Sequence, residues 1–275
     1  MGYRTMGYEG QITSWLPAAG VNEHIFGTWC RGNTATLTIT PGAQNTTGFG
    51  SLITTTATTG MAEWTVSVAG IAPKATPAIG NAGTVTFSGG YVAHVKSWAY
   101  TITSAEADVT SFADGTGKYK VYKPGLLTMT GTFTCFVDSA TLLKEPTLAG
   151  VAAAALVLTS QASNTVTADA IATAMTVSTP VEGVNEVTYT FQVSDPSIAF
   201  AGTTNLVPAT SALALPEYDS NSDGTPDATL TFQQSAGQVW SGPAFWNSLA
   251  VNCDAQGLIT TTIGIRGAGV LTPPA

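Results

Sequence analysis

Strict alternation of apolar and polar residues is the feature that most constrains the fold, and it is clearest in Val95–Asp138. The apolar positions of the first run are Trp98, Tyr100 and Ile102. Those of the second run are Met129, Gly131, Phe133 and Cys135, or the opposite set that ends in Phe136. Because successive side chains of a β-strand point to opposite faces, each run predicts a strand with one buried face.

The connection between these two strands has turn chemistry of its own. Asp114-Gly115 and Lys123-Pro124-Gly125 are both turn signals, and they stand about a strand's length apart. A connection of this length in a β domain is typically functional or an assembly element.

The order of a strand, Asp108-Val109-Thr110-Ser111-Phe112, Lys123-Pro124-Gly125 and a strand ending in Phe136-Val137-Asp138 resembles the major tail tube proteins of tailed bacteriophages. That family is also similar to the type VI secretion tube, and the resemblance covers roughly Tyr91 to Phe200. It implies that the segment is the first hairpin of a β-barrel domain whose long loop reaches onto neighbouring subunits. The residues assigned to this inter-subunit loop are Asp108, Ser111, Phe112, Lys118, Tyr119, Lys120, Tyr122 and Pro124.

The loop Thr116–Lys123 holds three of the nine basic residues of the chain, next to two tyrosines. A nucleic-acid patch is one interpretation. Because the charges are few and the protein is acidic, the sequence favours a contact between subunits, in which the tyrosines contribute buried apolar area.

Composition also favours assembly. Only 9% of the 275 residues are charged while 44% are hydrophobic, which predicts a folded chain with surfaces that become buried between copies. The net charge of −8 argues against tight binding to phosphate backbones. Acidity is ordinary in soluble proteins, but it also suits the wall of a tube through which DNA passes without binding.

Cysteine and histidine give no sign of catalysis or metal binding. Cys30, Cys135 and Cys253 are odd in number and far apart, so we expect free thiols in a reducing compartment. His24 and His94 lack an acidic partner at a telling spacing, and no nucleophile motif occurs, so an enzyme is not expected. We expect no secretory signal and no membrane segment, because the most apolar run, Ala149–Leu158, is far short of the roughly 20 residues that span a bilayer.

An internal repeat relates Ala155–Gln192 to Thr229–Arg266 without a gap, at an offset of 74 residues. Apolar positions match: Leu156 with Leu230, Leu158 with Phe232, Val166 with Trp240, Met175 with Leu249, Val177 with Val251, Tyr189 with Ile263 and Phe191 with Ile265. Each copy predicts a strand followed by a hairpin, with the turn glycine at Gly183 or Gly257. Chance alignment of Thr/Val-rich strands is the alternative interpretation. A true repeat implies two closing hairpins and hence two barrels.

The predicted domains are an N-terminal arm and strands (1–83), a central tail-tube-like barrel (84–200) and a linker with the closing hairpin of a second barrel (201–275). The strands at Thr34–Thr40 and Trp64–Val68 could complete that second barrel. Residues 1–30 form either an arm that docks on a neighbour or a packed irregular start. Ser139–Leu148 predicts the one short helix.

One local motif resembles short calcium loops. Asp219-Ser220-Asn221-Ser222-Asp223-Gly224-Thr225-Pro226-Asp227 places oxygen side chains at alternate positions before a glycine, as hard cations require. The candidate ligands of a Ca²⁺ ion are Asp219, Asn221, Asp223 and Asp227. Leu230 stands where an EF-hand has glutamate, so a solvated linker rich in Asx and Gly is the alternative.

The sequence therefore predicts an all-β, tail-tube-type barrel or sandwich, duplicated, with one short helix and long inter-subunit loops. The resemblance implies a structural virion protein that forms trimeric or hexameric rings, stacked into the conduit for DNA ejection. It implies the tape measure, tail terminator and baseplate proteins as partners, the virion tail as location, and the host cytoplasm during assembly. No cofactor is required on this interpretation. A β-sandwich decoration module that binds glycan or a receptor is the alternative.

Overall fold

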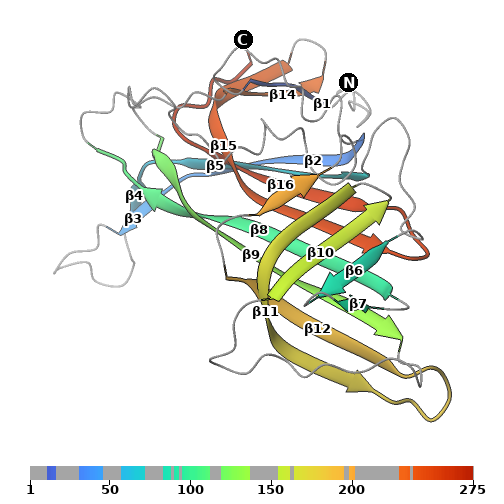
Figure 1. Ribbon diagram of the computed structural model, residues 1–275. Helices are drawn as coiled ribbons and strands as arrows, with labels where there is room; N and C mark the ends of the chain where they lie inside the picture. Colours follow the sequence, from blue (N-terminus) through green and yellow to red (C-terminus); the bar gives the residue numbers. More distant parts are fainter. Residues whose placement is uncertain are drawn as a thin grey trace.

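The computed structural model describes residues 11–16, 31–45, 57–71, 83–87, 90–92, 95–111, 119–136, 154–161, 164–194, 198–201, 229–235 and 238–274. All regular structure in these ranges is β, which confirms the predicted all-β class (Figure 1). The predicted helix at 139–148, the calcium-like loop and most of the N-terminal arm lie outside them. Within the same ranges, no helix has the length and hydropathy needed to cross a membrane.

The strands in chain order are β1 (Gln11–Leu16), β2 (Arg31–Thr40), β3 (Ala43–Asn45), β4 (Ala57–Thr59), β5 (Glu63–Ile71), β6 (Thr84–Phe87), β7 (Gly90–Val92), β8 (Val95–Asp108), β9 (Tyr122–Phe136), β10 (Ala154–Gln161), β11 (Asn164–Ser178), β12 (Glu186–Val193), β13 (Ala199–Ala201), β14 (Thr229–Ser235), β15 (Gln238–Asp254) and β16 (Thr260–Gly267). Fourteen of them form one antiparallel sheet, whose path runs β2-β5-β16-β15-β8-β9-β12-β11-β10-β6-β7. β14 pairs with β15 and β1, β13 pairs with β11, and β3 and β4 form a separate pair.

The sheet is open, so the expectation of closed β-barrels is wrong. A barrel requires its first and last strands to pair. The path instead ends at β2 and β7, which do not pair with each other in the described part of the chain. The reason is that β8 pairs with both β9 and β15, which joins the two expected barrels into one sheet. The result is a β-sandwich-like fold.

One hydrophobic core lies inside this fold. Trp98, Tyr100 and Ile102 of β8 are buried, as their alternation predicts. On β9 the buried set includes Phe133 and Cys135 rather than the set ending in Phe136. The Phe87 ring of β6 lies 6.2 Å from that of Phe133, centroid to centroid, so β6 packs across the same face. The core thus holds together strands far apart in sequence.

The predicted repeat is confirmed by strand order and register. We name β8, β9, β10, β11 and β12 unit B, and β2, β5, β14, β15 and β16 unit A. Within unit B the order is β8-β9-β12-β11-β10, and within unit A it is β2-β5-β16-β15-β14. Leu156 faces Ala168 between β10 and β11, and 74 residues later Leu230 faces Gly242 between β14 and β15. Even the register shift at Ala172/Ala174 recurs at Trp246/Ser248.

The register also matches β9 with β5 and β8 with β2, although no sequence repeat marked these strands. The matched pairs are Phe133–Tyr189 with Val68–Ile263, and Trp98–Phe133 with Ala35–Val68. The register shift at Val95/Ser97 in β8 recurs at Gly32/Thr34 in β2. Position for position, β2 is therefore the unit A counterpart of β8.

Two of the predicted turns have different outcomes. Gly183 lies between β11 and β12 with φ 128°, a conformation that favours glycine, so the turn predicted there is confirmed. Lys123-Pro124-Gly125 was expected to be a turn but belongs to β9. The register between β8 and β9 shifts at Ser104/Glu106, opposite this segment, and proline is tolerated at such a bulge because its missing N–H is not needed there.

Candidate assembly interface

The arm comprises Ser104–Ser111 and Tyr119–Leu127, the ends of β8 and β9 with the described parts of their connection. Beyond Thr103, β8 no longer pairs with β15 and continues against β9 as far as the pair Asp108–Tyr122. The backbone N–H of Val109 then donates to the carbonyl oxygen of Val121 at 3.0 Å. The two ends of the loop are therefore fixed beside each other.

A side-chain turn ends β8. The backbone N–H and the hydroxyl of Thr110 both donate to Oδ1 of Asp108, at 3.0 and 2.6 Å. The Thr110 hydroxyl oxygen in turn accepts from the N–H of Val121 at 2.9 Å. Aspartate favours turns because its carboxylate binds backbone two residues on, so the Asp-Val-Thr motif fixes where the loop leaves the strand.

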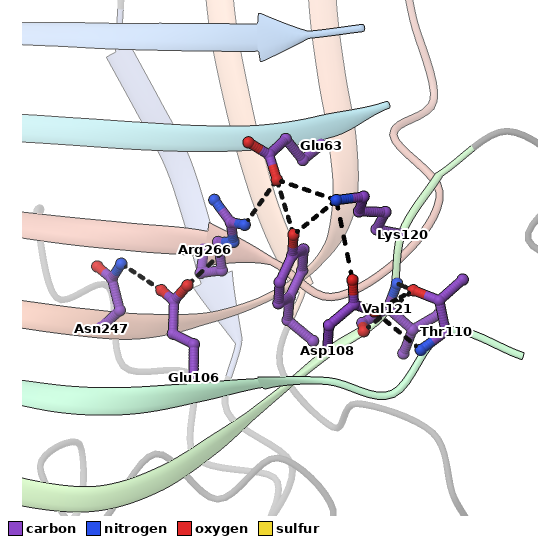
Figure 2. A network of polar contacts seen from close by, with 9 residues as sticks. Glu63, Glu106, Asp108, Thr110, Lys120, Val121, Asn247 and Arg266 are labelled. Carbon is purple, nitrogen blue, oxygen red and sulfur yellow. Dashed lines mark hydrogen bonds and ion pairs between the residues drawn. The ribbon is translucent and has the colours of Figure 1, made fainter. Parts of the chain in front are cut away.

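A network of polar contacts holds the arm against β5 and β16 (Figure 2). The Tyr122 hydroxyl donates to Oε2 of Glu63 at 2.7 Å, and Nη2 of Arg266 donates to the same oxygen at 2.9 Å. The Nζ atom of Lys120 lies 3.9 Å from Oε2 of Glu63 and 3.8 Å from Oδ2 of Asp108. Glu63 is thus shared by three donors from two strands and the arm.

The same network continues to β15. The Nε atom of Arg266 lies 3.4 Å from Oε2 of Glu106, and Nδ2 of Asn247 donates to Oε1 of Glu106 at 2.6 Å (Figure 2). The Arg266 guanidinium also lies over the Tyr122 ring, 3.8 Å from its centroid, where cation–π attraction adds to the ion pairs. With its side chain 12% exposed, Arg266 is the most enclosed charge of the network.

The network keeps its carboxylates ionised. The hydrogen bond from Tyr122, helped by Arg266 and Lys120, lowers the pKa of Glu63 against the opposing effect of burial. The Thr110 hydrogen bonds lower the pKa of Asp108, while burial raises the pKa of Tyr122. All three shifts move away from neutral pH, whereas a general acid or base works best with a pKa near it. The arrangement is that of a structural clamp.

The clamp joins the two units of the chain. Glu63, Arg266 and Asn247 belong to unit A, and their partners belong to the unit B arm. Beneath the charges lies a small apolar cluster of Val121, Tyr122, Phe245 and Ala268. The N–H of Lys120 donates to the carbonyl oxygen of Ala62 at 2.9 Å, so the backbones are tied as well.

The units also share a direct strand pairing, the internal junction, between β15 and β8. It runs antiparallel from Ser248–Thr103 to Asp254–Ser97. Its inward side chains alternate between the strands and are at most 2% exposed: Trp98, Tyr100, Ile102, Leu249, Val251 and Cys253. Backbone pairing and apolar burial thus coincide at this junction.

The counterparts of both junction strands have open edges. β2, the counterpart of β8, pairs with β5 alone among the described strands, and Thr34–Thr40 are exposed apart from the half-buried Leu37. In β11, the counterpart of β15, the edge opposite β12 is paired by β10 only as far as Ala170. Val177 is 44% exposed there, while its counterpart Val251 is 2% exposed.

Six of the eight loop residues assigned to a subunit contact lie in the described part of the chain: Asp108, Ser111, Tyr119, Lys120, Tyr122 and Pro124. The structure brings Asp108, Lys120 and Tyr122 together in the clamp. Their partners there belong to the same chain, so a contact with another subunit stays a prediction. Phe112, Lys118 and the four candidate calcium ligands lie outside the described residues. Within those residues, no group of three or more His, Cys, Asp or Glu is placed to hold a metal ion.

Sequence reasoning missed the unit A half of the clamp and misjudged one acid. Glu106 was expected to be a solvated loop residue beside Asp108, but it belongs to β8 and binds Arg266 and Asn247. Its partners lie 141 or more residues away in sequence, so no local pattern announces them. The only available signal was the scarcity of charge: an arginine in an apolar strand of a chain with nine basic residues needs a partner.

Comparison with known proteins gives little further identification. No protein-family model matches the chain, and no curated protein matches it. Among solved structures, the SPP1 tail tube, a hybrid structure from solid-state NMR and cryo-EM, matches 47% of this chain and 81% of that chain. The sequence identity is 16% and the TM-score is 0.32. A likeness at that level carries no argument about function.

Proposed function

We propose that this chain is a self-assembling structural subunit of a phage tail tube, joined edge to edge in rings that stack into a hollow tube. One observation carries the proposal. The positions that are buried where unit A meets unit B recur, exposed, at the two open edges of the same chain. An open strand edge with apolar side chains is a template for pairing with another chain.

The contrast between counterparts is large. Ile39 is 38% exposed where its counterpart Ile102 is 2% exposed, and Val177 is 44% exposed where Val251 is 2% exposed. A second copy placed on these edges would bury them as the internal junction does. Because each chain has two units, three copies would make a ring of six units, one of the two ring sizes that the resemblance implies.

The class of assembly rests on the sequence resemblance of Tyr91–Phe200 to tail tube proteins. The net charge of −8 supports it, since an acidic wall repels the phosphates of passing DNA. On this proposal the protein is not an enzyme and resides in the virion tail after assembly in the host cytoplasm. The tape measure, terminator and baseplate proteins are its further partners.

Light scattering coupled to size-exclusion chromatography tests the proposal. We expect the native chain to elute as rings or longer species, and Val177→Lys to remain monomeric because it places a charge on the open edge. Val184→Lys is the matched control: Val184 is also exposed, at 56%, but lies beyond the end of β11. A native chain that stays monomeric at high concentration would refute self-assembly and favour the decoration module.

A further inference from the structure

We infer that β2 of one copy pairs antiparallel with the free edge of β11 in a second copy, in the register of β8 on β15. The inference rests on the proposed function and adds the residues through which copies join. It uses the internal junction as the template for the external one.

The register follows from the counterparts. At the internal junction Leu249 faces Ile102 and Val251 faces Tyr100. The counterparts of Leu249 and Val251 are Met175 and Val177, and those of Ile102 and Tyr100 are Ile39 and Leu37. The external junction therefore places Met175 opposite Ile39, and Val177 opposite Leu37. Both pairs are apolar, although neither strand shows in sequence that it faces the other.

The polar positions and the end of the pairing also fit. Between the apolar pairs, Thr176 falls opposite Thr38, and cross-strand Thr–Thr pairs stabilise antiparallel sheets. The register ends with Thr179 opposite Ala35. The next residue of that strand is Pro180, which has no N–H to donate, so the chain itself marks where the ladder stops.

The contact is head-to-tail, because the two edges differ. Such an interface closes into a ring or continues as a helix, depending on the rotation between copies. If the external junction repeats the internal one, successive units are related by similar rotations along the whole ring. A second copy is therefore the occupant that both edges fit.

Cysteine crosslinking tests the register in the full chain. Thr38→Cys and Thr176→Cys are combined in a Cys30→Ser background, where the two remaining cysteines are buried and free. Facing residues of an antiparallel pair have Cβ atoms about 4.5–5.5 Å apart, close to disulfide geometry, whereas diagonal neighbours are about 7–8 Å apart. Thr38→Cys with Ser178→Cys is such a diagonal pair and serves as the matched control.

On mild oxidation we expect the facing pair to give covalent dimers and larger species on non-reducing gels. We expect the diagonal pair and each single variant to give no more than background. Equal crosslinking by both pairs would overturn the register, and dimers from the Thr38→Cys chain alone would show that two β2 strands pair with each other. If light scattering shows rings but no pair crosslinks, the inference fails while self-assembly stands. If the chain is monomeric, both fail.

Discussion

Tyr122→Phe tests the clamp most selectively, because it deletes one oxygen and keeps the ring under Arg266. The lost contact is the 2.7 Å hydrogen bond to Glu63. Hydrogen bonds to charged groups contribute about 1.5–3 kcal/mol. Since the Glu63 side chain is 30% exposed, we discount this for solvent and expect a loss of about 1–2 kcal/mol in the free energy of unfolding.

The pH dependence gives the same prediction a sign. The folded pKa of Glu63 is lowered below its ordinary 4.5, chiefly by Tyr122. The stability this contributes is complete above pH 4.5 and is lost as pH falls through the lowered folded pKa. The difference between native chain and variant should therefore be largest near neutral pH and shrink in acid.

Urea unfolding at several pH values, at a protein concentration below that of self-association, measures this difference. Glu63→Gln and the double variant complete a mutant cycle, in which we expect a coupling of about 1 kcal/mol at pH 7. Strict additivity of the two substitutions, or a Tyr122→Phe effect that does not change with pH, would refute the account of the clamp.

Three other predictions address the core, the thiols and the calcium-like loop. A Cβ at Gly267 would collide with the Trp64 ring, so Gly267→Ala should destabilise the chain by about 1–3 kcal/mol in thermal unfolding. Gly257→Ala, whose Cβ would meet nothing nearer than 3.7 Å, should have little effect, and the reverse order would contradict this packing. Burial raises the pKa of Cys135 to about 11 and that of Cys253 to about 12, so a maleimide at pH 7 should label them only in urea; rapid labelling of the native chain would contradict their burial. If Asp219, Asn221, Asp223 and Asp227 bind calcium, isothermal titration should give heat that Asp223→Asn reduces at least about tenfold in affinity, and an equal response of both chains would refute the site.

Sequence alternation predicts much of this fold because period-2 burial is a local property. Trp98, Tyr100 and Ile102 could be assigned to a buried face from their spacing alone. The repeat at an offset of 74 likewise predicts matching strands, since a true repeat preserves spacing. The turn at Gly183 followed from the same local logic.

What the sequence could not predict is the long-range pairing. Neither β8 nor β15 carries a mark that they pair with each other, so the joining of two expected barrels into one open sheet was missed. The clamp was missed for the same reason, because Glu63 and Arg266 lie 203 residues apart. The correspondence of β2 with β8 is visible only as register, since Ala35 and Trp98 share no chemistry.

A cryo-EM reconstruction of the assembled protein tests the central claim most directly. The account predicts rings in which β2 of each copy lies antiparallel beside β11 of the next, with Ile39 facing Met175 and Leu37 facing Val177. Assemblies in which these two edges stay exposed, or pair with any other strand, would contradict it.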